Sequence, residues 1–174
     1  MIGATGRGGP AASAGRIGAM ILRYWYLLRS SWPRLLELVY WPTVQMFMWG
    51  FLQSYLHQQE GMLALAGGAL LGAVLLWDIL FRGQIGFSIS FLEEMWAQNL
   101  GHLMISPLRA GEFIAALMVM SLIRVIIGVV PVSVMAVYFF GFNIYGLGLA
   151  LVGFFVILMV TSWAIGLLVC GLVL

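Results

Sequence analysis

The sequence has no lysine, a single cysteine and very few charges. Charged residues make up 8% of the 174 residues and hydrophobic residues 63%, whereas a soluble domain carries charge on about a quarter of its residues. Without lysine the chain cannot form the usual GxxxxGK[ST] phosphate loop. The lone Cys170 excludes an internal disulfide framework or CxxC motif. We therefore expect a membrane protein that is not an enzyme and binds no cofactor of its own.

Long apolar runs dominate the sequence. Each contains about 20 residues or more, enough for a helix to cross ~30 Å of hydrocarbon. They predict an all-α integral membrane protein with four transmembrane helices, at 35–56, 62–81, 113–140 and 147–174. The last run reaches Leu174 without a polar flank, which we interpret as a truncated membrane domain.

The arginines are distributed unevenly between the connecting segments. Arg82 and Arg109 lie between the second and third runs, and the segment before the first run contains Arg7, Arg16, Arg23, Arg29 and Arg34. Positively charged loops stay on the cytoplasmic side of a membrane. We therefore expect the N-terminus and the 82–112 loop to be cytoplasmic, and we do not interpret the net charge of +2 as a nucleic-acid signal.

The N-terminal region divides into two parts before the transmembrane domain at 32–174. Residues 1–15 are rich in Gly, Ala and Ser and suggest a flexible cytoplasmic tail. Residues 16–31 predict an amphipathic helix at the membrane interface, because apolar side chains recur there every three or four residues; these are Ile17, Ile21, Tyr24, Trp25 and Leu28.

Polar and aromatic side chains recur at every fourth position of the first run. The ridge continues from Glu37 and Trp41 to Gln45, Trp49 and Gln53. Such a ridge avoids lipid, so Gln45, Trp49 and Gln53 are candidates for lining a transport path. The alternative, hydrogen bonding between helices, is the commoner use of such residues.

Two ionisable residues lie deep in apolar runs. Arg124 is twelve residues beyond Glu112, or ~18 Å of helix rise, and needs a partner there. Asp78 is our candidate, because side chains lean toward the start of their own helix and the two helices would run in opposite directions. We expect a structural ion pair between Asp78 and Arg124, with a proton relay or substrate site as the alternative.

The 82–112 loop is expected to be structured. Ser90 and Glu93 match the capping-box spacing and predict a short helix starting near Ser90. Ser106 and Pro107 match a helix cap followed by proline, which would start the third span. The short helix mixes apolar and charged residues, so it could dock on a cytoplasmic protein or merely cover the ends of the spans.

Several segments carry a family resemblance, namely RYWYLLRSSWPRLLELVYWP, LLWDILFRGQIGFSISFLEEMWAQNLGHLMISPLRAGEF, SLIRVIIG and SWAIGLL. Over residues 23–171 the chain resembles the membrane-spanning permease subunit of type-2 ABC (ATP-binding cassette) exporters, with the C-terminal spans missing. The LEEMW motif, Asn99 and the stretch from SPLR to Glu112 are the most specific part.

The resemblance implies a cytoplasmic coupling helix at about 91–103. The residues that would contact a separate ATPase are Phe91, Leu92, Glu93, Glu94, Met95, Trp96 and Asn99. It also implies that ATP and magnesium bind to that ATPase, that two permease units form the path as a homodimer or with a second permease, and that the chain lies in a bacterial inner (plasma) membrane.

Two other functions are compatible with the sequence. A secondary transporter or channel would use intramembrane charges and need no ATPase. A truncated fragment that binds the ATPase or a full-length permease without transporting is the other. An enzyme is disfavoured, because GFSIS lacks the GxSxG pattern and His57 and His102 fall on opposite sides of the predicted membrane.

Overall fold

The computed structural model describes residues 9–58 and 62–173, which are almost entirely helical. The elements are α1 (Pro10–Ser30), α2 (Trp32–His57), α3 (Met62–Trp96), α4 (Leu100–Ile105), α5 (Ala110–Phe140), the 3-10 helix η1 (Ile144–Leu147) and α6 (Leu149–Val173). The predicted all-α class is confirmed for this part of the chain.

Three of the described helical segments are long and apolar enough to cross a membrane. They are Ala69–Trp96 within α3, Ala110–Phe140 and Leu149–Val173. The 26-residue α2 is as long as α6, but Arg34, Glu37, Gln45 and Gln53 lower its mean hydropathy. The structure therefore supports a membrane protein with three candidate spans.

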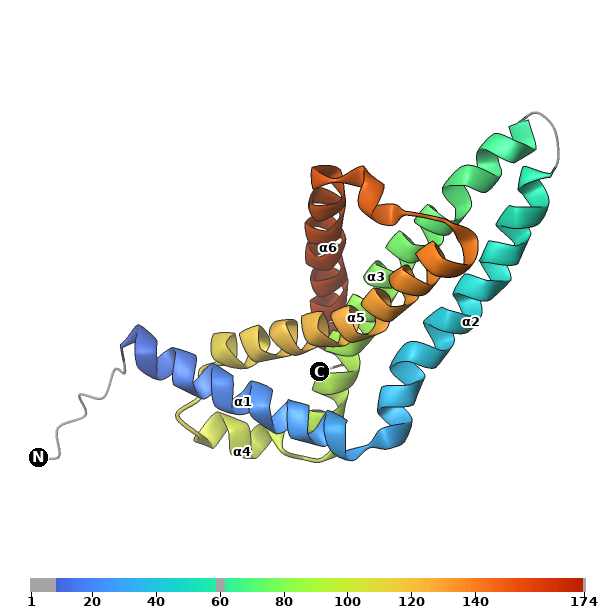
Figure 1. The fold of residues 1–174 in the computed structure, drawn as a ribbon. Coiled ribbons are helices and arrows are strands. Elements are labelled where there is room, and N and C mark those ends of the chain that lie inside the picture. The colour runs from blue at the N-terminus through green and yellow to red at the C-terminus, as the bar shows by residue number, and fades with distance from the viewer. Residues whose placement is uncertain (1–8, 59–61, 174) are drawn as a thin grey trace, which may run out of the picture.

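Helix α3 lies at the centre of the bundle. Figure 1 shows α2 and α3 as an antiparallel pair, with α5 crossing them and η1 leading from the end of α5 to α6. Helix α3 contacts α2, α5 and α6. Helix α1 lies along the first half of α5, next to the short α4. The antiparallel arrangement of α2 and α3 is the one expected when consecutive spans recross a membrane.

Close approach of α6 to α3 depends on two glycines. A Cβ atom at Gly83 of α3 would collide with Ser162, and one at Gly166 of α6 would lie 2.9 Å from Phe87. Small residues let helix backbones approach closely where lipid provides no hydrophobic driving force for association. The same face of α6 contributes the buried Met159 and Cys170.

Helix α1 is longer than predicted and its apolar stripe is buried by protein. The helix starts at Pro10, which suits the first helical position because proline lacks the N–H left unpaired there. Residues 9–15, predicted as tail, are therefore mostly helical, and residues 1–8 lie outside the described part. Met20, Tyr24 and Leu28 are buried in a cluster with Phe87, Ala116 and Leu117.

Both helix starts predicted in the 82–112 loop are wrong. Helix α3 continues through Ser90 to Trp96, and the Ser90 hydroxyl donates to the carbonyl of Gly86 inside the helix, at 3.0 Å. Ser106 lies at the end of α4, and α5 starts at Ala110. The real capping interaction is from the Arg109 N–H to the Glu112 carboxylate, at 3.0 Å.

Candidate functional site

The arginine-rich N-terminal region is tied to the loop side of the bundle by ion pairs. Arg23 of α1 pairs with Glu94 at the end of α3, through Nη1–Oε1 at 2.9 Å and Nη2–Oε2 at 3.1 Å. The two parallel contacts form the forked geometry that suits guanidinium and carboxylate groups. Arg34 at the start of α2 pairs with Glu93, at 2.9 Å. Both acidic residues predicted to contact an ATPase are therefore engaged within the chain.

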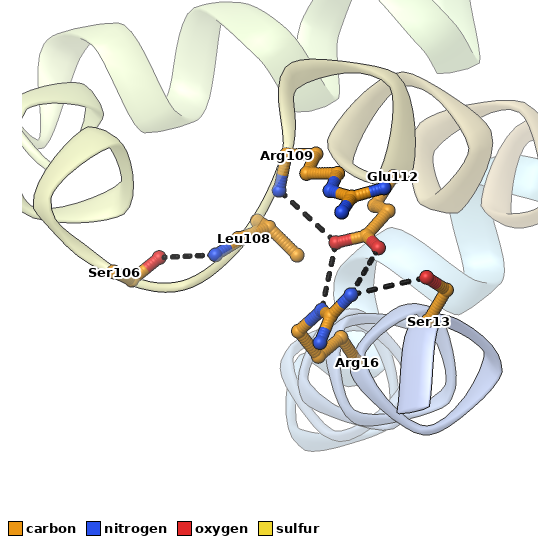
Figure 2. Close-up of polar contacts among 6 residues, drawn as sticks. All are labelled: Ser13, Arg16, Ser106, Leu108, Arg109 and Glu112. Carbon is orange, nitrogen blue, oxygen red and sulfur yellow. Dashed lines mark hydrogen bonds and ion pairs between the residues drawn. The ribbon is translucent and has the colours of Figure 1, made fainter. Parts of the chain in front are cut away.

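A second clamp joins α1 to the start of α5, as Figure 2 shows. The Glu112 carboxylate accepts from Arg16 Nε at 2.8 Å and Arg16 Nη2 at 2.5 Å. Arg16 also donates to the hydroxyl of Ser13, at 3.0 Å. The hydrogen bond with Glu112 raises the pKa of Arg16 above its ordinary value. The Glu112 carboxylate thus caps α5 and holds α1 against it at the same time.

The predicted coupling residues divide by exposure. Glu94 is 3% exposed and Phe91 9% exposed, whereas Trp96 is 72% exposed. Leu92, Glu93, Met95 and Asn99 are half-buried. Of the predicted set, Trp96 is the side chain that another protein could readily contact.

Trp96 belongs to a small exposed tip that we call the α3–α4 tip, formed by Trp96, Gln98, His102 and Ile105. Gln98 adopts a left-handed φ of 54° in the turn between the two helices. Ile105 is 86% exposed, although it is an aliphatic residue. Figure 1 shows that this tip lies at the same end of the molecule as α1.

A cavity of about 420 Å³ opens among α2, α3 and α5, beside the end of α1. Its volume falls in the range of ligand-binding pockets, ~300–1,000 Å³. Ionisable side chains are concentrated in its lining, in a chain that has few; they are Arg34, Glu37, Asp78, Arg82, Glu93 and Arg124. The cavity is therefore the second candidate site.

Asp78 and Arg124 both line this cavity, but they do not form the predicted ion pair. Asp78 instead pairs with Arg82 on the next turn of α3, with Nε–Oδ2 at 2.6 Å. Arg124 donates through Nη1 to the carbonyl of Gly86, at 3.4 Å, and its Nε has no hydrogen-bond partner among the described residues. A partner four residues along the same helix is closer than one on a crossing helix.

The three predicted path-lining residues lie in different environments. Gln45 lines the cavity. Trp49 packs against the buried cluster that contains Met46 and Leu71. Gln53 is buried and accepts a hydrogen bond from the backbone N–H of Leu71, at 3.1 Å. Gln53 thus joins α2 to α3 by a hydrogen bond between helices, which is the alternative to lining a transport path.

The ion-pair partners Arg23, Arg34 and Arg82 were not predicted from the sequence. The spacing of Asp78 and Arg82 was a visible signal, since residues four apart share a helix face. Arg23 and Arg34 gave no such signal, because their partners are distant in sequence. Among the described residues, no group of His, Cys, Asp and Glu side chains could hold a metal ion.

Comparisons with protein-family models, with curated proteins and with solved structures found no match to this chain.

Proposed function

We propose that this chain is the permease subunit of a type-2 ABC exporter, with α2 as a fourth span before the three candidate spans. In this proposal α1 lies at the cytoplasmic face of a bacterial inner membrane. A separate cytoplasmic ATPase binds ATP and magnesium, and a second permease unit, either another copy or a related chain, completes the export path.

The observation that carries the proposal is the exposed apolar tip at the arginine-rich end. Trp96 and Ile105 are 72% and 86% exposed, beside ion pairs formed by arginines of α1 and α2. Arginine-rich segments stay in the cytoplasm, and an exposed tryptophan with a polar rim is typical of a protein-binding anchor. An ATPase in the cytoplasm would meet this tip first.

Ion pairs could transmit movement from the tip to the bundle. Helix α3 continues without a break from the tip to the centre of the bundle, and Glu93 and Glu94 attach its end to α2 and α1. A force applied at Trp96 would therefore displace α3 and α1 together. Conversion between two packing arrangements, driven by closure of the ATPase on ATP, would then open the path to alternate sides.

Site-specific photo-crosslinking tests this proposal. A benzophenone amino acid is placed at Trp96, at Ile105 or, as the control, at Tyr138, in cells of the source organism. Tyr138 is 84% exposed and lies near the far end of α5, ~40 Å along the helix from Ala110. We expect products from Trp96 and Ile105 that contain a P-loop ATPase by mass spectrometry, and none from Tyr138.

Two outcomes would reject the proposal. One is the absence of a P-loop ATPase from the Trp96 and Ile105 products while the chain is folded and in the membrane. The other is an equal yield of the ATPase product from Tyr138, which would show that contact does not depend on the tip.

A further inference from the structure

One buried cation in the cavity lining, Arg124, forms no ion pair with the described residues. Asp78 is neutralised by Arg82 at 2.6 Å, and Glu93 by Arg34 at 2.9 Å. Glu37 is exposed, whereas Arg124 is only 9% exposed and pairs with no carboxylate among the described residues. Arg124 is therefore a buried cation of the lining that forms no ion pair with described residues, while the exposed Glu37 in the same lining also has none.

Arg124 retains hydrogen-bond donors for a ligand. A guanidinium group has five N–H donors in a planar fork. Its one hydrogen bond with described residues is the long 3.4 Å contact from Nη1 to the Gly86 carbonyl, and its Nε is buried and has no partner among those residues. Gly86 itself lines the cavity and has no side chain to fill it. Guanidinium groups in such a setting bind phosphate or carboxylate in a bidentate manner.

The outer edge of the cavity is apolar. Phe81, Ile85 and Ile89 follow one another at four-residue spacing on α3, and they are 46%, 36% and 42% exposed. Trp41 of α2, also in the lining, is 55% exposed. In a membrane, these side chains would face the hydrocarbon of the lipids. A ligand that fits both parts has an anionic group for the interior and hydrocarbon for the edge.

We propose that the cavity binds the phosphate head group of a membrane phospholipid, with Arg124 donating to the phosphate and the acyl chains lying against Phe81, Ile85 and Ile89. The site does not involve the α3–α4 tip and does not depend on an ATPase. The phosphate would be the counter-ion of the buried Arg124, which Asp78 does not provide because it pairs with Arg82.

Native mass spectrometry of the purified chain in detergent tests the assignment. The probes are phosphatidylglycerol, diacylglycerol with the same acyl chains, and inorganic phosphate. We compare the wild type with Arg124→Gln and with a control, Arg29→Gln, because Arg29 is exposed and forms no ion pair with described residues. We expect phosphatidylglycerol to bind the wild type and the control equally, and to bind Arg124→Gln at least ~10-fold more weakly.

The two remaining probes separate the parts of the ligand. Diacylglycerol should not bind at matched concentrations, because it lacks the phosphate. Inorganic phosphate should compete only weakly, because it gains nothing from the apolar edge. An affinity for inorganic phosphate equal to that for phosphatidylglycerol would assign the site to a free anion and overturn the proposal that it binds a lipid.

If Arg124→Gln fails to fold, Gly86→Ala provides a second test that keeps the arginine. A Cβ at Gly86 would lie 3.6 Å from Arg124 and Ser121, an ordinary contact distance, so this variant should fold with a slightly smaller cavity. We expect it to weaken phosphatidylglycerol binding too. Unchanged binding in the variant that folds, or equal binding of diacylglycerol, would overturn the proposal.

Discussion

The ion pair between Arg23 and Glu94 makes an asymmetric prediction about stability. The two side chains differ in burial, since that of Arg23 is 38% exposed and that of Glu94 is 3% exposed. Removing the arginine leaves a buried carboxylate without its partner, whereas removing the carboxylate leaves a guanidinium group that water can reach. Arg23→Met should therefore destabilise the fold more than Glu94→Gln.

The magnitudes follow from burial. Breaking a buried pair so that one charge stays uncompensated costs about 3–5 kcal/mol. Loss of a charge-assisted hydrogen bond whose remaining partner is solvated costs about 1–2 kcal/mol. Arg34→Met provides an internal comparison, because Arg34 and Glu93 are 48% and 27% exposed, and such an exposed pair is worth about 0–1 kcal/mol.

The assay is denaturant unfolding in mixed micelles, followed by far-UV circular dichroism, with Arg29→Met as the control on the same helix. A double-mutant cycle with Arg23→Met and Glu94→Gln measures the coupling energy. Equal effects of the two single variants, or a larger effect of Glu94→Gln, would refute the reasoning from burial. A coupling energy near zero would refute the ion pair itself.

Three further predictions concern the bundle. Gly166→Val should lower the melting temperature, because a Cβ there would lie 2.9 Å from Phe87, whereas Gly171→Val should not, because nothing lies within 4 Å; an equal loss in both would contradict the proposed α3–α6 contact. Cys170, at 5% exposure, should react slowly with a maleimide in mild detergent and rapidly in SDS, and rapid reaction in both would show that this face of α6 is open. Gln53→Leu should cost about 0.5–1.5 kcal/mol by denaturant unfolding, through loss of the hydrogen bond to Leu71, and an unchanged or raised free energy of unfolding would count against it.

Much of the fold could be predicted from local patterns. The apolar runs predicted the long helices, and the three-and-four spacing of apolar residues predicted a helix in the region of α1, although Tyr24 and Leu28 of its apolar stripe, expected at the membrane interface, are buried against protein. Those features depend on residues a few positions apart. The length of α3 could not be judged in this way, because a serine that matches a capping pattern can also bond to the carbonyl four residues earlier, as Ser90 does with Gly86.

The candidate sites were harder to predict, because they depend on how helices cross. The predicted pair of Asp78 and Arg124 depended on the direction in which the two side chains lean. It left out Arg82, which reaches Asp78 on the same helix. Likewise, the acidic residues of LEEMW were predicted to face a partner, and both are paired with arginines within the chain. Charge alone does not distinguish an internal ion pair from a docking contact.

The orientation of the α3–α4 tip tests the central claim most directly. In a Cys170→Ser background, single cysteines at Trp96 and Tyr138 are treated with a membrane-impermeant maleimide in intact cells and in inside-out vesicles. We predict that Trp96→Cys is labelled only in the inside-out vesicles, and Tyr138→Cys only in intact cells. Labelling of Trp96→Cys from outside intact cells would contradict the proposed cytoplasmic docking of an ATPase at this tip.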